Sequence, residues 1–256
     1  MGKKLPTKMT SGSTKISKLR WLLYGYPKVG KTSLLSGFPK AVFAATEKGY
    51  VALKVYKVDI KDWEDFIDLV DEILDEDEHS FKTVIIDVVD TLFDKCSEYV
   101  CDKLGIEHES EGEWGRGWAE VRKEFTRVVN RLLQSNLGVI FVSHTKSEKV
   151  ISIAEEVTRT VPTLAGAARK ILLPLVDTIG LMRYKTVKVG KGNYEKKLVI
   201  TFEASNSLLE AGDRTGLLPP EIKLEVIPEG EKRTPDVVAK YAKRNYERIA
   251  KYYEQN

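Results

Sequence analysis

The chain has 256 residues, of which 42% are hydrophobic, enough for one large domain or one domain with small additions. No apolar run approaches the roughly 18 residues of a membrane span, and the basic residues at the N-terminus precede no apolar segment of the secretory type. Cys96 and Cys101 have neither metal-ligand nor redox spacing. These features favour a soluble cytoplasmic protein with no membrane partner.

Charge is distributed unevenly along the chain. The formal net charge is +3, yet no acid precedes Glu47, so residues 1–46 carry +9 and the remainder carries −6. A basic segment can hold nucleic acid or another polyphosphate, or it can simply keep a tail soluble. We expect residues 1–17, rich in Lys, Ser, Thr and Gly, to form a flexible basic arm. The high charged content, 31%, with very few Gln, is also typical of a thermophile.

Apolar runs alternate with helical patterns over the first 145 residues. Uniformly apolar runs, typical of strands buried on both faces, occupy residues 20–25, 41–46, 83–87 and 138–143. Apolar residues at helical spacing predict helices over 31–38, 62–74, 92–100 and 118–133. Asp59 is a plausible N-cap for the second helix. The alternation predicts an α/β fold in which helices cover both faces of a mostly parallel sheet.

The pattern changes after about residue 175. The segments 177–187 and 196–204 flank a Gly-containing turn, and together they predict an antiparallel hairpin. Thr234 and Pro235 form a good N-cap and first-turn pair. We therefore expect a terminal helix after the hairpin.

The stretch from Gly25 to Thr32 reads G-x-x-x-x-G-K-T, the pattern of a phosphate-binding loop. Its glycines let backbone N–H groups turn toward phosphates, and the following helix adds partial positive charge. Lys31 is expected to reach the β- and γ-phosphates, and Thr32 to ligate Mg²⁺. The alternative, a Gly-rich hairpin, would have no strand before it and no helix after it. The predicted nucleotide-contacting residues are Gly25, Tyr26, Pro27, Lys28, Val29, Gly30, Lys31, Thr32 and Ser33.

Acidic and polar residues follow the other predicted strands. Asp87 ends an apolar run, where ligands collect in open α/β sheets, and we expect it to hold Mg²⁺ through water. Many helicases and ring ATPases place a catalytic Glu at the next position, which here is Val88. Glu47 is therefore the candidate general base, with an ordinary loop residue as the alternative. His144 either senses the γ-phosphate or merely caps its strand.

Other classes of phosphate-loop protein fit the sequence less well. A small-molecule kinase would carry an Arg-rich lid, and none is clear. The N-K-x-D motif of GTPases and the L-S-G-G-Q motif of transporter ATPases are both missing.

Six motifs spread over about residues 20–225 point to one superfamily. They are YGYPKVGKTS, ATEKG, TVIIDVVDTL, WGRGW, GVIFVSHTK and EAGDRTGLLPPEI. The combination resembles the RecA-like ATPases, and more closely the phage-type nucleotide-binding proteins that include single-domain relatives of single-strand annealing recombinases. The phosphate loop is specific only to the superfamily, whereas the last three motifs indicate the subfamily. Val88 occupies a position where such proteins often carry Ser or Thr. Because valine has no hydroxyl group, the hydrogen bonds around Asp87 are expected to differ from those of the family.

The resemblance implies a Mg²⁺-dependent ATPase domain over residues 18–230, followed by a C-terminal helix over 231–256, with ATP and ADP as ligands. It also implies a homo-oligomeric ring or filament that binds ATP between subunits, in the host cytoplasm if the protein is phage-encoded. Arg214, on a Gly-flanked loop, is the candidate for a finger that reaches a neighbour's γ-phosphate. Alternatively, Asp213 and Arg214 only order that loop.

The resemblance further implies that two loops, at about 105–117 and 145–165, touch single-stranded DNA. In the first, which is acidic, only Trp114, Arg116 and Trp118 suit base stacking, unless the tryptophans pack at the start of the long helix. The cations suited to phosphate contacts lie in or just after the second loop: Lys146, Lys149, Arg159, Arg169 and Lys170. Two hypotheses stay open, an ATP-dependent DNA-binding protein of phage-type recombination and an assembly or regulatory ATPase that never binds DNA.

Overall fold

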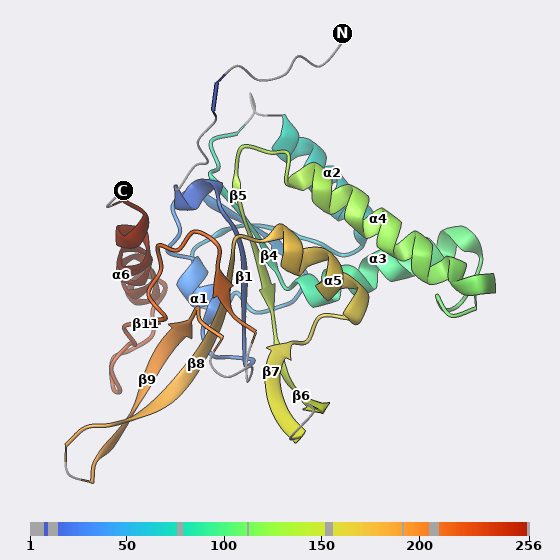
Figure 1. Cartoon of the computed structure of the whole chain (residues 1–256). Helices are drawn as coiled ribbons and strands as arrows, with labels where there is room; N and C mark the ends of the chain where they lie inside the picture. Colours follow the sequence, from blue (N-terminus) through green and yellow to red (C-terminus); the bar gives the residue numbers. More distant parts are fainter. Residues whose placement is uncertain are drawn as a thin grey trace.

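A mostly parallel sheet forms the centre of the protein (Figure 1). The structure, a computed structural model of the whole chain, describes residues 8–9, 15–75, 79–111, 113–151, 156–190, 192–204 and 210–254. The strand order is β11-β9-β8-β1-β5-β4-β2-β3, and β8 through β3 run parallel to one another. The parallel strands are β1 (Arg20–Gly25), β2 (Ala41–Ala45), β3 (Tyr56–Asp59), β4 (Thr83–Asp87), β5 (Gly138–Ser143) and β8 (Thr178–Lys188).

Helices cover the sheet on both faces, which confirms the α/β prediction. In β4 the side chains of Val84 and Ile86 join one hydrophobic core, whereas Ile85 joins the other, because successive side chains of a strand point to opposite faces. The first core contains α2 (Trp63–Leu74), α3 (Val89–Leu104), α4 (Arg116–Leu132) and α5 (Gly166–Leu175). The second contains α1 (Lys31–Leu35) and α6 (Pro235–Glu254).

The predicted antiparallel hairpin is confirmed as β8 and β9 (Tyr194–Thr201). It extends past the sheet as a two-stranded ribbon (Figure 1). Two short strands complete this side: β10 (Gly212–Asp213) pairs with β8, and β11 (Glu221–Lys223) pairs with β9.

Several local predictions need correction. Asp59 does not cap α2; it ends β3, an exposed edge strand without an apolar pattern. Asp62 caps α2 instead, and its side chain accepts a hydrogen bond from the Asp65 N–H at 2.9 Å. Within the predicted basic arm, a short 3₁₀ turn, η1 (Ile16–Lys18), packs beside β5, while residues 1–7 and 10–14 lie outside the described part of the chain.

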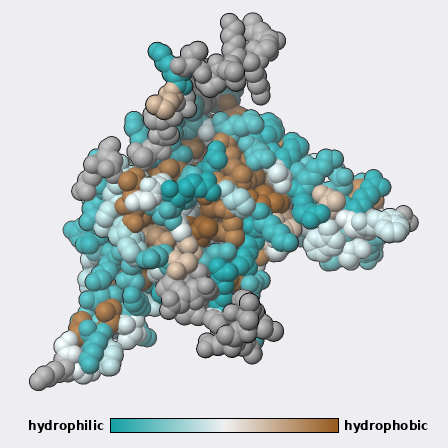
Figure 2. Space-filling view, viewed as in Figure 1, coloured by the Kyte–Doolittle hydropathy of each residue, from teal (hydrophilic) through white to brown (hydrophobic). Residues whose placement is uncertain are grey.

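The described parts of the two predicted DNA loops contain regular secondary structure. The second is an antiparallel hairpin of β6 (Thr145–Ile151) and β7 (Glu156–Pro162), separate from the main sheet, with residues 152–155 outside the described part. The first contains the 3₁₀ turn η2 (Glu113–Gly115), after which α4 begins directly. The joined ends of α3 and α4 project from the body and are hydrophilic, whereas hydrophobic residues gather near α5 (Figures 1 and 2). No helix in the described ranges is both long and apolar enough to cross a bilayer.

The C-terminal helix belongs to the second core. The Thr234 hydroxyl accepts a hydrogen bond from the Val237 N–H at 3.3 Å, so the predicted cap is present. The ring of Tyr246 packs edge-on against Phe38 with ring centres 4.9 Å apart. Gly37 lies against the backbone of α6, where an added Cβ would sit 2.2 Å from the Ala242 carbonyl oxygen. The contact between α1 and α6 therefore requires glycine at this position.

We predict that Gly37→Ala lowers the free energy of unfolding by about 1–3 kcal/mol, the usual cost of overpacking. Urea or thermal unfolding checks this, with Gly166→Ala as the control because a Cβ there meets no atom within 4 Å. Equal stability of both variants would show that α6 adjusts freely on α1.

Candidate functional site

The predicted phosphate loop connects β1 to α1, with the strand before it and the helix after it that the motif requires. Its backbone turns twice into the left-handed region, at Lys28 (φ 64°) and Gly30 (φ 105°). Gly25 sits tightly against β8, since an added Cβ would lie 2.3 Å from the Met182 carbonyl oxygen. The two glycines of the motif thus meet different demands, close packing at Gly25 and backbone conformation at Gly30.

Lys31 is 5% exposed, an unusual degree of burial for a cation. Its ammonium donates hydrogen bonds to the carbonyl oxygens of Gly25 at 2.8 Å and Tyr26 at 3.2 Å. Burial lowers the pKa of Lys31, while the nearby carboxylates, Asp87 foremost, act in the opposite direction. The loop therefore holds a buried positive charge at its centre.

Asp87 ends β4 beside α1, as the sequence predicted, and is 6% exposed. Its Oδ2 accepts hydrogen bonds from the Thr32 hydroxyl at 2.8 Å and from the Tyr50 hydroxyl at 3.1 Å. Burial raises the pKa of this carboxyl, and the two hydrogen bonds partly counter that effect.

The predicted metal ligands Thr32 and Asp87 are thus in direct contact. A hydroxyl and a carboxylate are oxygen donors of the kind that Mg²⁺ prefers, and a cation there would offset the buried charge of Asp87. The described residues contain no cluster of three or more His, Cys, Asp or Glu that could hold a metal alone. This donor set fits Mg²⁺ shared with phosphate oxygens and water.

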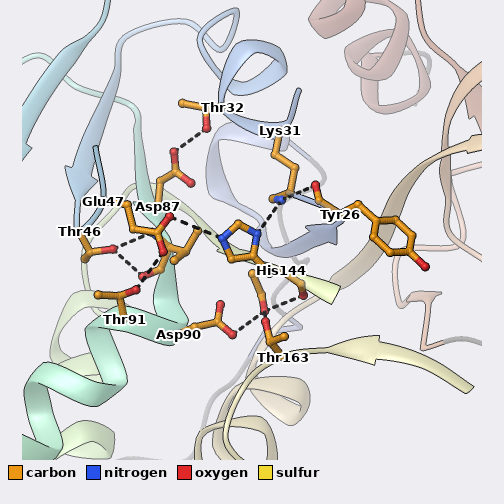
Figure 3. A network of polar contacts seen from close by, with 12 residues as sticks. Tyr26, Lys31, Thr32, Thr46, Glu47, Asp87, Asp90, Thr91, His144 and Thr163 are labelled. Atoms are coloured by element: carbon orange, nitrogen blue, oxygen red, sulfur yellow. Dashed lines mark hydrogen bonds and ion pairs between the residues drawn. The ribbon is translucent and has the colours of Figure 1, made fainter. Parts of the chain in front are cut away.

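His144 lies between Lys31 and Glu47, with its ring facing both (Figure 3). The Nδ1 atom is 3.4 Å from the Lys31 ammonium, and Nε2 is 3.5 Å from a Glu47 carboxylate oxygen. Because an ammonium can only donate, Nδ1 is the acceptor and the ring proton belongs on Nε2, facing Glu47. His144 therefore contacts the phosphate-loop cation and the candidate base together.

The register of the sheet brings Glu47 to this place. β2 pairs with β4 and β3, and Ala45 lies opposite Asp87, so the residues just after β2 adjoin the Asp87 strand rather than β1. Glu47 accepts a hydrogen bond from the Thr91 hydroxyl at 3.1 Å. Its side chain remains 45% exposed and can reach solvent.

A cavity of about 360 Å³ lies in front of these groups, within the range of roughly 300–1,000 Å³ typical of small-molecule sites. The phosphate loop forms one wall, and the groups on Glu47, Asp87 and His144 form the other. Of the predicted site residues, the cavity is lined by all but four: Gly25, Tyr26 and Val29 of the loop, and Arg214.

Arg214 lies at the opposite end of the sheet. It follows β10, which pairs with the first residues of β8, and these lie beside the start of β1, whereas the phosphate loop follows the end of β1. Its guanidinium donates to the Pro174 carbonyl oxygen at 3.1 Å and is 3.7 Å from the Asp177 carboxylate. The neighbouring Asp213 carboxylate accepts hydrogen bonds from the N–H groups of Leu217 and Leu218. Asp213 therefore orders this loop, and Arg214 does not contact its own chain's phosphate loop.

Sequence reasoning missed three contributors to the site. The Tyr50 hydroxyl donates a hydrogen bond to Asp87, although Tyr50 belongs to no sequence motif that would identify it as a site residue. The hydroxyl of Thr46, the residue after β2, accepts from the Val88 N–H at 2.8 Å and donates to the Val88 carbonyl oxygen at 2.9 Å, so it provides polar contacts beside Asp87 although the Val88 side chain is apolar. Arg233, from the segment before α6, also lines the cavity.

Comparisons with known proteins agree with this geometry. The chain is similar to the SPbeta prophage-derived uncharacterized protein YorG of Bacillus subtilis (strain 168), at 25% identity over 167 residues. The match covers 63% of this chain and 49% of that protein, so the chain spans about half the length of this relative. A family model described as an AAA domain matches residues 17–215. Because that match covers most of the chain, and its phosphate loop lies within it, the protein belongs to this AAA-domain family of phosphate-loop ATPases.

Proposed function

We propose that the protein hydrolyses ATP in a Mg²⁺-dependent reaction, and that its nucleotide state controls binding to single-stranded DNA. The observation that carries the first part is the convergence of Lys31, Glu47 and His144 with the Thr32–Asp87 pair around one cavity. Acid, cation and imidazole come from the segments that follow separate strands, which is how open α/β sheets assemble sites.

In this proposal each side chain has a distinct task. Lys31 exchanges its bonds to loop carbonyls for the β- and γ-phosphate oxygens. Thr32 and Asp87 would hold Mg²⁺, which neutralises charge on the phosphates when bound. Glu47 orients a water and takes its proton, because its carboxylate faces the cavity and is open to solvent. His144, in contact with Lys31 and Glu47, responds to the γ-phosphate.

The proposed oligomer would give Arg214 its role. Arg214 is about two-thirds exposed at the end of the sheet remote from its own phosphate loop, so a contact with a γ-phosphate requires a neighbouring subunit. Its planar guanidinium group can donate two hydrogen bonds to phosphate oxygens at once. Arg214 could act in a ring or filament in which the end of the sheet that carries Arg214 in one subunit meets the phosphate loop of the next subunit.

For DNA, the ion pairs argue against the predicted loop at 145–165, which forms the β6–β7 hairpin. Arg169 is paired with Glu148 at 3.0 Å and with Glu210 at 2.9 Å, and Lys146 is paired with Glu148 at 3.0 Å. Arg169, on α5, thereby connects β6 to the body, and Lys146 pairs within β6, so both cations are less available for DNA phosphates.

The β8–β9 ribbon offers more accessible cations. Lys188 and Lys196 are exposed, and neither forms an ion pair with another described residue. An exposed tyrosine, Tyr194, accompanies them on the same ribbon. Phosphate contacts beside aromatic rings are the usual means of binding single strands. We therefore place the proposed DNA contact on the ribbon, with fully exposed Trp114 as a second stacking residue.

The second candidate function is an assembly or regulatory ATPase that does not bind DNA. The ion pairs of Lys146 and Arg169 with Glu148 favour it, because they give these two cations partners within the protein.

We predict that Lys31→Ala abolishes ATP hydrolysis and weakens nucleotide binding, because the phosphates lose their buried cation. Phosphate release and ATP titration measure both effects. Lys82→Ala, an exposed lysine outside the site, is the control. Unchanged turnover in Lys31→Ala would remove the basis for the phosphate-loop assignment.

Glu47→Gln is expected to keep ATP binding but to lower turnover by about 10²–10⁴-fold, because Gln cannot accept the proton of water. Single-turnover hydrolysis at saturating ATP is the measurement, and the exposed Glu98→Gln on α3 is the matched control. Normal hydrolysis by Glu47→Gln would place the base elsewhere.

The double variant Lys188→Ala/Lys196→Ala should bind single-stranded DNA more weakly in the presence of ATP. The slope of log K against log salt concentration should become shallower by about 0.7 for each DNA phosphate that the variant no longer neutralises. Fluorescence anisotropy at several salt concentrations tests this, with Lys82→Ala/Lys240→Ala as the charge-matched control. Absence of binding by the unaltered protein, with and without ATP, would favour the second candidate function.

A further inference from the structure

A second cavity, of about 140 Å³, adjoins the phosphate cavity. It lies between the phosphate loop, the β8–β9 pair and the segment that leads into α6. Four residues line both cavities, namely Lys28, Gly30, Ser33 and Arg233. Because the two spaces share these walls, a ligand whose phosphates lie on the loop can continue into the second cavity.

The walls of this second cavity differ from those of the first. Met182 and Val238 are buried and apolar, and the rings of Tyr184 and Tyr241 also border the space. The Met182 methyl group lies against the phosphate loop, 3.7 Å from where a Cβ of Gly30 would be. Apolar and aromatic walls suit a flat heterocycle rather than another phosphate.

One edge of the cavity also offers unused backbone hydrogen-bonding groups. Among the described residues, the N–H and C=O groups of Val226 and Ile227 make no hydrogen bond. This extended segment is nevertheless held in place. The Leu224 N–H donates to the Leu198 carbonyl oxygen at 2.9 Å, and the Asn245 side chain bonds both the N–H and the C=O of Glu225, at 2.7 and 2.9 Å. A fixed strand edge with free donors and acceptors can recognise the polar edge of a base.

Arg233 stands at the junction of the two cavities. It is exposed and forms no ion pair with another described residue, in contrast to the neighbouring Arg244 and Arg248, which both pair with Glu225. An unpaired guanidinium between a phosphate space and an apolar space suits the phosphate closest to the sugar.

We propose that the second cavity holds the base and sugar of the nucleotide, and that Val226, Ile227 and Tyr241 complete the site with Arg233 on the phosphates. This proposal rests on the proposed ATPase function. It gives α6 a role in ligand binding, although the matched family domain ends at residue 215. The close approach of Gly37 to α6 then fixes the distance between the phosphate loop and the wall that holds the base.

The test compares two probes, ATP and inorganic tripolyphosphate, each titrated with Mg²⁺ into the full chain. The unaltered protein should bind ATP more tightly than tripolyphosphate. Tyr184→Ala/Tyr241→Ala should weaken ATP about tenfold, as expected when a base has no ring to pack against, and leave tripolyphosphate unchanged. Tyr194→Ala, an exposed tyrosine of the same ribbon, is the control and should change neither. Tyr184→Ala alone, at an exposed position, should show a smaller effect in the same direction and guards against misfolding.

Arg233→Ala should weaken both probes, whereas Lys232→Ala, the same loss of charge one residue away, should weaken neither. Unchanged ATP affinity in the tyrosine variants, or equal affinity of the unaltered protein for both probes, would overturn the nucleoside site while the phosphate site stands. Failure of the unaltered protein to bind either probe would overturn the proposed ATPase function and this inference with it.

Discussion

The site depends on two opposite charges buried at the same edge of the sheet. Lys31 and Asp87 are each almost inaccessible to water, and burial of either charge alone would cost several kcal/mol. The charge of each residue favours the charged form of the other. Each also has hydrogen-bond partners, the loop carbonyls for Lys31 and two hydroxyl groups for Asp87. The fold supplies this arrangement by ending β1 and β4 at one level, with β5 and its following His144 between them.

The same edge connects the nucleotide site to the outer hairpin. His144 is followed at once by β6, and its carbonyl oxygen accepts a hydrogen bond from the Thr163 N–H at 3.1 Å, just after β7. The hairpin is in turn anchored by Arg169 through Glu148 and Glu210. If the imidazole moved on phosphate binding, the movement would act on the start of the β6–β7 hairpin, while Arg169 would still hold the hairpin at Glu148.

The sequence predicted best those features that depend on local patterns. Buried parallel strands are apolar throughout, so β1, β2, β4 and β5 could be found, and the glycine spacing marked the loop between β1 and α1. β3 was missed because it is an exposed edge strand, and the β6–β7 hairpin was missed because its strands lack a regular apolar pattern. Tyr50 and Arg233 could not be assigned, because their positions in the site depend on how distant segments pack.

The bonds from Lys31 to Gly25 and Tyr26 have a further consequence for turnover. The Lys31 ammonium has acceptors in the carbonyls of Gly25 and Tyr26 and in His144 Nδ1, so a nucleotide would exchange hydrogen bonds instead of satisfying an unmet one. The net gain from each new bond is then modest, as for most exchanged hydrogen bonds. If ATP is hydrolysed as proposed, the same carbonyls would be able to accept the ammonium again once the terminal phosphate has left.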